Sequence, residues 1–111
     1  MPDSAPQARI VLTTVADAGE AARLARALVE ERLAACATIL PGAQSIYRWQ
    51  GEVETATECL LLLKTGLEQL PALETRLHAL HSYETPEFLV LAVESGSRGY
   101  LEWLQSCLKP V

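Results

Sequence analysis

The residues best suited to chemistry in this sequence are a cysteine, a histidine pair and a short acidic loop. Cys36 opens a β-prone run, His78 and His81 are three residues apart, and Glu84 and Glu87 follow them closely. Thiolates favour Cu(I), imidazole suits copper and zinc, and carboxylates suit harder ions. Histidines at this spacing share one helix face and can meet a single ion. These residues are therefore candidate metal ligands.

Each candidate also has a purely structural interpretation. Cys36 fits a small hydrophobic residue at the start of a core strand, and Cys59 and Cys107 lie in apolar surroundings that favour this role more strongly. A histidine near a helix C-terminus is favoured by the helix dipole alone. The sequence shows no Ser-His-Asp order, no evident pair of catalytic carboxylates and no phosphate-binding loop. An enzyme is the least supported class.

The stretch from Cys36 to Thr65 organises the rest of the chain. Two β-prone runs flank Gln50-Gly51, and such a polar-Gly pair is typical of a two-residue hairpin turn because glycine adopts a positive φ easily. The hairpin predicts three cross-strand pairs, namely Trp49 with Glu52, Arg48 with Val53, and Tyr47 with Glu54.

Each arm of this hairpin runs to roughly twice the usual strand length. A short chain can cover only its inner part, so the outer part should project, with Pro41-Gly42 bending the first arm. Exposed strand edges are usually blunted or paired with another chain. The aromatic residues Tyr47 and Trp49 suit anchoring on a partner subunit. We therefore expect the long hairpin to build an oligomer.

The remaining segments predict a ferredoxin-like architecture. Residues 8–15 form an inner strand, a helix capped by Asp17 and Glu20 runs to about Leu33, a second helix runs from Glu68 to Leu80, a buried strand covers 88–93, and a closing helix contains Leu101, Leu104 and Leu108. Two crossovers joined by a hairpin give the split βαβ arrangement. The expected fold is α+β, a ferredoxin-like βαββαβ sandwich with a long β-hairpin and a C-terminal helix.

Composition narrows the function classes. The chain has 111 residues, half of them hydrophobic, which predicts one domain over residues 8–111 after a flexible tail at 1–7. A net charge of −5 disfavours nucleic acid as a partner. No apolar run is long enough to insert into a membrane. Three widely spaced cysteines and the lack of a signal peptide predict reduced thiols and a cytoplasmic protein.

Several short motifs together resemble the CutA divalent-cation tolerance family. They are Glu30-Glu31-Arg32-Leu33-Ala34-Ala35-Cys36, Leu40-Pro41-Gly42, Tyr47-Arg48-Trp49-Gln50-Gly51, Leu63-Lys64-Thr65, His81-Ser82-Tyr83-Glu84-Thr85-Pro86-Glu87 and Tyr100-Leu101-Glu102-Trp103-Leu104. The resemblance covers about residues 9 to 108. It implies a ferredoxin-like subunit that forms a homotrimer through its long hairpins, and a link to copper and other divalent metal ions.

The chain departs from the family at the metal positions. Members credited with a copper site carry a Cys on the first strand and a His pair before the loop, where this chain has Thr13 and Leu80-His81. Ser82 also replaces the Pro that is common after this His. We therefore expect a non-enzymatic trimer of metal-ion response that binds copper or a similar divalent ion through His81 and a loop carboxylate such as Glu84, or through Cys36.

Two other function classes remain open. One is a small-molecule sensor whose inter-subunit clefts hold a signal, as in ferredoxin-like trimers of the P-II signalling type. The other is a structural trimer that serves as a scaffold for a membrane-anchored or metabolic partner protein. Metal binding alone favours the metal-response interpretation, binding of a nucleotide favours the sensor, and binding of neither favours the scaffold.

Overall fold

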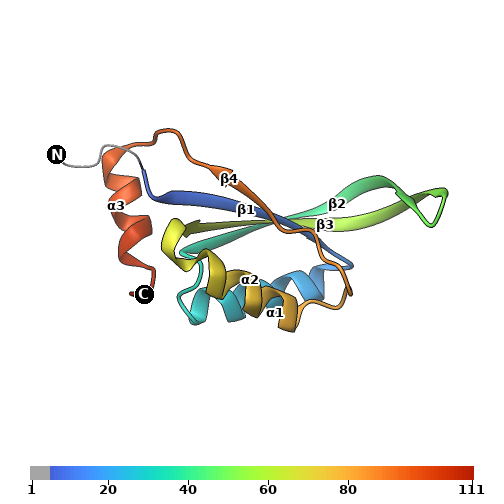
Figure 1. Cartoon of the computed structure of the whole chain (residues 1–111), viewed down its shortest axis with the longest axis horizontal. Helices are drawn as coiled ribbons and strands as arrows, with labels where there is room; N and C mark the ends of the chain where they lie inside the picture. Colours follow the sequence, from blue (N-terminus) through green and yellow to red (C-terminus); the bar gives the residue numbers. More distant parts are fainter. Residues whose placement is uncertain (1–5) are drawn as a thin grey trace.

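The computed structural model describes residues 6–111, which form a four-stranded antiparallel sheet with the two longer helices on one face and a third helix at one end (Figure 1). The strand order is β2-β3-β1-β4. Along the chain the elements are β1 (Ala8–Val15), α1 (Ala18–Glu30), β2 (Cys36–Trp49), β3 (Glu52–Gly66), the 3₁₀ turn η1 (Leu67–Gln69), α2 (Leu70–Leu80), β4 (Leu89–Ala92) and α3 (Arg98–Ser106). The predicted ferredoxin-like α+β fold is confirmed, as is β1 as an inner strand.

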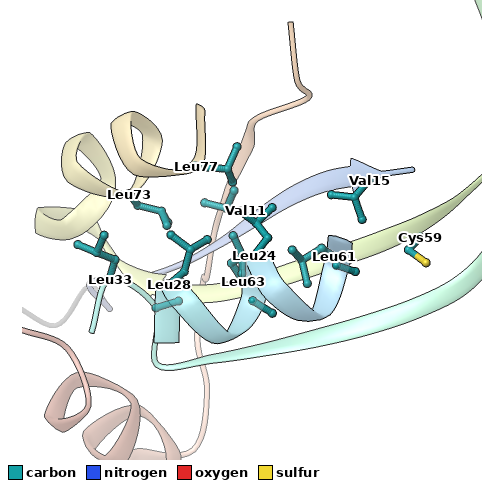
Figure 2. Close-up of a cluster of buried hydrophobic side chains, with 13 residues drawn as sticks. Val11, Val15, Leu24, Leu28, Leu33, Cys59, Leu61, Leu63, Leu73 and Leu77 are labelled. Carbon is teal, nitrogen blue, oxygen red and sulfur yellow. The ribbon is translucent and has the colours of Figure 1, made fainter. Parts of the chain in front are cut away.

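The core lies between the sheet and helices α1 and α2. Leu24 and Leu28 of α1 and Leu73 and Leu77 of α2 point towards β1 and β3 in Figure 2. They meet alternate residues of those strands, namely Val11, Val15, Cys59, Leu61 and Leu63, all almost fully buried. Burial of a leucine or valine side chain contributes about 1.5–3 kcal/mol, so this layer holds the subunit together.

The long hairpin projects beyond this core (Figure 1). The three predicted pairs at its tip are confirmed, and Gln50 and Gly51 form the turn with φ values of 51° and 83°. Positive φ at both central residues is the geometry that matches the twist of a two-residue hairpin. The projection makes the molecule long, with extents of 51 × 25 × 22 Å.

The predicted helix to Leu33 is too long, because α1 ends at Glu30. Arg32 adopts a left-handed φ of 61°, and the backbone N–H groups of Leu33 and Ala34 both bond to the carbonyl of Leu28. This turn drops Leu33 into the core outside the helix. A buried residue at helical spacing therefore does not require a helix.

The predicted N-terminal cap of α1 is half right. Asp17 accepts a hydrogen bond of 2.8 Å from the Glu20 backbone N–H, as expected. Glu20, however, does not reach back to complete the capping box. Its carboxylate accepts from the backbone N–H of Ser82 at 2.9 Å and from the Ser82 hydroxyl at 2.8 Å. Glu20 thus ties the start of α1 to the loop after α2.

The prediction of a buried last strand is wrong for the subunit. β4 lies at the sheet edge beside β1, and Leu89, Val90 and Leu91 are 56%, 42% and 47% exposed. The apolar run is a strand, as predicted, but no helix or strand of the described chain covers it. Within residues 6–111 these side chains are therefore open to solvent.

The C-terminal helix α3 packs at the end of the sheet opposite the hairpin tip (Figure 1). Leu104 and Leu108 are buried against Ala8 and Ala35, which confirms the predicted closing helix. The Lys109 backbone N–H donates to the carbonyl of Arg32. Residues 1–5 of the predicted tail lie outside the described residues.

Candidate functional site

A cleft of about 790 Å³ opens between the outer half of the hairpin and the loop that follows α2. Its walls come from three strands and the loop: Thr14 of β1, residues 44–47 and Trp49 of β2, Glu58 of β3, and residues 83–85 with Glu87. Hairpin and loop are remote in sequence, and the fold brings them together.

A β-bulge decides which side chains of β2 can share a face with this cleft. Leu40 pairs with Leu60 but Ala43 pairs with Glu58, so β2 carries one extra residue at Pro41-Gly42. Because strand side chains alternate between faces, one extra residue exchanges the faces of everything beyond it. The bulge therefore turns Tyr47, and Trp49 two residues on, to the side of Glu58.

Glu58 and Tyr83 form the best-defined polar contact of the cleft. Glu58 is only 8% exposed, and the Tyr83 hydroxyl donates a hydrogen bond of 2.5 Å to its Oε2. Burial, followed by this hydrogen bond and the charge of Glu58, raises the pKa of Tyr83 well above its usual range. Tyr83 therefore stays a protonated donor and Glu58 its carboxylate acceptor.

Two further carboxylates border the same space. Partial burial, and then the nearby charge of Glu58, raises the pKa of Glu87 above its ordinary value. Glu84 also lines the cleft and is exposed. The wall is thus acidic, and the repulsion between Glu58 and Glu87 is the kind that a bound cation relieves.

His81 is a buried link in the scaffold. Its side chain is fully shielded, with Nε2 2.8 Å from the carbonyl oxygen of Thr14 and Nδ1 3.0 Å from the backbone nitrogen of Tyr83. A neutral ring with its proton on Nε2 satisfies both contacts, donating to Thr14 and accepting from Tyr83. Glu20 Oε2 lies 3.7 Å from Nδ1. Both ring nitrogens are engaged, so a metal would have to displace one partner.

The other predicted ligands lie apart from His81. The exposed His78 ring has Nδ1 2.9 Å from the carbonyl of Glu74, on its own helix. Cys36 is at the far end of the hairpin, with Sγ 3.8 Å from the Tyr100 hydroxyl. Within residues 6–111, no three His, Cys, Asp or Glu side chains converge in a way that would hold one metal ion. Of the candidate ligands, the structure brings Glu84 and Glu87 into the cleft.

Sequence reasoning missed Glu58 as a site residue. It precedes the apolar run Cys59 to Leu63, and adjacent strand residues point to opposite faces. With Cys59 in the core, Glu58 must face the side of the sheet opposite α1 and α2, so the alternation itself was a usable signal. The burial of Glu58 on that face depends on Tyr83, and no pattern in the local sequence predicts that Tyr83 lies next to β3.

The three cysteines are free thiols, Cys59 buried and Cys36 and Cys107 partly exposed. In the described part of the chain, none of the helices has the length and apolar character needed to cross a bilayer.

These features define a class: a ferredoxin-like subunit with an overhanging hairpin and an acidic, aromatic-walled cleft at its base. A family model described as "CutA1 divalent ion tolerance protein" matches residues 9–107. The divalent-cation tolerance protein CutA of Thermus thermophilus is 52% identical over 96 residues, covering 86% of this chain and 93% of the relative. The chain belongs to the CutA divalent-cation tolerance family.

Solved structures agree with this assignment. The Cut A1 structure from Thermus thermophilus superposes with a TM-score of 0.90 at 49% identity, covering 92% of this chain and 99% of that one. CutA1 from Oryza sativa gives 0.93 at 37% identity, covering 98% and 100%. A structure described as the periplasmic CutA from Archaeoglobus fulgidus gives 0.89 at 32% identity, covering 92% and 99%. The overhanging hairpin is therefore part of a shared fold.

Proposed function

We propose that the chain is the subunit of a non-enzymatic homotrimer of divalent-metal response, assembled through its long hairpins. Support for assembly comes from apolar side chains that the subunit leaves exposed. Ile46 and Val53 on the outer hairpin are 71% and 63% exposed, and the β4 leucines are about half exposed. A monomer gains nothing from such a surface, whereas a closed ring of copies buries it and also removes the free strand edges.

Sedimentation of the purified protein tests the trimer. We expect a mass three times the 12.1 kDa of the chain at micromolar concentration. Replacing the tip, residues 47–54, by an Asn-Gly turn should weaken assembly, because it removes paired edges and aromatic anchors together. A 12.1 kDa species for the intact protein would contradict the proposal, and an unchanged trimer of the variant would exclude a role for the tip.

We propose that divalent ions bind weakly at the cleft carboxylates. The observation that carries this placement is the proximity of Glu58 to Glu87, whose pKa is raised by burial and then by the charge of Glu58. Carboxylates are ligands that hard divalent ions prefer, while a soft Cu(I) site needs thiolates that are not gathered here. The placement at His81, Cys36 and Glu84 that the sequence favours stays an alternative prediction, with Glu84 common to both.

Calorimetric titration with Cu(II) and Zn(II) separates the two placements. Glu58→Gln and Glu87→Gln should weaken binding at least about tenfold if the carboxylates are ligands, because charge-assisted contacts are the strong ones. Cys36→Ser should then change little, and so should His81→Gln, which keeps a side-chain donor and acceptor near Thr14 and Tyr83. Glu68→Gln, an exposed carboxylate outside the cleft, is the matched control. Loss of binding in Cys36→Ser alone would identify a thiolate site instead.

The pH dependence gives a second, independent readout. A histidine ligand must lose its ring proton to coordinate, so protons compete with the metal ion and binding through His81 should weaken on acidification. Carboxyl groups in general ionise at lower pH than imidazole, so binding at the cleft should weaken at a lower pH than binding through a histidine. The cytoplasmic location expected from the free thiols is a further prediction, which fractionation of the source cells tests directly.

A further inference from the structure

We propose that the cleft binds a small organic cation, an aliphatic amine with one or two ammonium groups. This deepens the proposed function, because the ligand would use the same carboxylates as a divalent ion. The family is described by its response to divalent metal ions, and that description assigns no organic ligand to the cleft.

The charge of the cleft selects a cation. Glu58, Glu84 and Glu87 line it, and no lysine or arginine is among its lining residues in the described part of the chain. The closest basic side chain along the hairpin, Arg48, instead reaches the carbonyl of Gly51 at the tip. An anion or a nucleotide phosphate would find only like charge here.

The buried carboxylate has one oxygen to spare. Tyr83 donates to Oε2 of Glu58, whereas Oε1 accepts no hydrogen bond from any residue in the range 6–111. Glu58 is 92% buried, since its exposed fraction is 8%, and it faces into the cleft. Among the described residues, the buried side-chain oxygens without a partner are Thr13 Oγ1 and Gln69 Oε1, so Glu58 Oε1 is open to the cleft. It can accept an N–H from a charged ligand, which is a strong, charge-assisted bond.

The aromatic walls distinguish an organic cation from a metal ion. Tyr47, Trp49 and Tyr83 all line the cleft, and aromatic faces attract ammonium groups while their edges and rims pack on methylene chains. A metal ion gains little from indole or phenol rings. Its requirement for several converging ligands is also unmet, because no cluster of three such ligands occurs among the described residues.

The size of the cleft fits this ligand class. A volume of about 790 Å³ falls within the range of about 300–1,000 Å³ that small-molecule sites occupy. The carboxylates are spread along its wall on β3 and on the loop, so an elongated diamine can place one ammonium group at Glu58 and the other at the exposed Glu84.

The cleft adjoins the hairpin surface that we propose for assembly, so the assembled protein is the proper test object. We would titrate it with diaminobutane by calorimetry, beside butanediol and succinate of the same chain length. A Trp103→Phe variant leaves Trp49 as the reporter of fluorescence, since the chain has two tryptophans. We expect saturable heat and a change in Trp49 emission with the diamine only.

Variants locate the binding. Glu58→Gln should weaken diamine binding at least about tenfold, and Glu87→Gln, at a more exposed position, tests the same charge without risk to the core. Glu94→Gln, outside the cleft, should bind as the parent does. Equal binding of butanediol, unchanged binding in both cleft variants, or no binding because a neighbouring copy fills the cleft would each overturn the proposal.

The outcomes also separate this inference from the metal proposal. Diamine binding without Cu(II) or Zn(II) binding supports the organic ligand and rejects the metal site. Metal binding that is sensitive to Glu58→Gln, with no diamine binding, does the reverse. Competition between the two ligands would establish that they share the cleft.

Discussion

The inner and outer halves of the long hairpin are stabilised by different interactions. In the inner half of β3, Leu61 and Leu63 are fully buried under the helices. In the outer half, Val53 is 63% exposed and no helix of the described chain lies over it. The same two strands are therefore held by side-chain packing at one end and by their backbone ladder at the other, where an isolated hairpin is marginally stable.

The cleft lies at the boundary between the packed inner half and the projecting outer half of the hairpin. Cys59 is the last β3 residue in the core, and Glu58 is the first to face the cleft. The buried half fixes the position of Glu58, while the projecting half carries Tyr47 and Trp49 over it. A binding site at such a boundary combines a rigid floor with a wall that an assembly partner can adjust.

The largest contrast should come from truncating one side chain in each half. Leu63→Ala should lower the free energy of unfolding by about 2–5 kcal/mol, because it leaves a cavity in a packed core. Val53→Ala should act only through assembly, so its effect should fade on dilution. Urea denaturation over a range of protein concentrations measures both. A larger loss for Val53→Ala at every concentration would break the comparison.

Tyr83→Phe probes the boundary itself. It removes the donor from a carboxylate that is 8% exposed, and an unsatisfied buried acceptor costs about 1–3 kcal/mol. Tyr100→Phe is a matched control, because that hydroxyl meets only a thiol and the residue is 44% exposed. Thermal unfolding of the two variants should therefore differ. Equal melting temperatures would show that Glu58 finds another donor.

The turn offers a smaller effect in the outer half. Gly51→Ala forces a φ of 83° on a residue with a Cβ, which costs about 1 kcal/mol. Gly99→Ala, at a helical position with open space around its Cβ, should be neutral or stabilising. Urea titration measures the pair. If Gly51→Ala costs nothing, the turn must have relaxed to another type, which nuclear magnetic resonance would reveal.

The smallest effect concerns Glu87 and pH. Its pKa is raised in the folded protein, so the ionised form lowers stability above that pKa, and this penalty disappears as the pH falls through it. In the presence of a chelator, Glu87→Gln should raise the unfolding free energy at neutral pH by less than about 0.5 kcal/mol, and the gain should vanish in acid. A gain that grows in acid would contradict the assigned direction.

Sequence patterns predicted the elements better than the contacts between them. The bounds of β1 and the pairing of Trp49 with Glu52 followed from alternation and turn chemistry, which are local. The end of α1 was missed because Arg32 adopts a left-handed backbone conformation. An arginine gives no sequence signal for this conformation, unlike glycine or asparagine. The exposure of β4 could not be predicted from its own apolar residues, because it depends on whether other elements of the chain pack over the strand.

The site was harder to predict for the same reason. His81 looked like a ligand by residue type, yet its bonds to Thr14 and Tyr83 come from the fold. Glu58 was not singled out in the sequence, and Tyr83, which covers it, is 25 residues away along the chain. A residue's type states which bonds it can make, and only tertiary structure decides which of them are already made.

The bulge at Pro41-Gly42 has a consequence for how this surface can evolve. Loss of one codon there would leave the helical core untouched, because the pairs up to Leu40 and Leu60 precede it. The pairs beyond it would stay as they are, because β3 and the two-residue turn are unchanged and Tyr47 would still face Glu54. A single deletion there can thus remove the local bend and extra twist of the arm while its recognition surface keeps the same residues, so the bulge is a position where the length of the arm can vary at little cost to function.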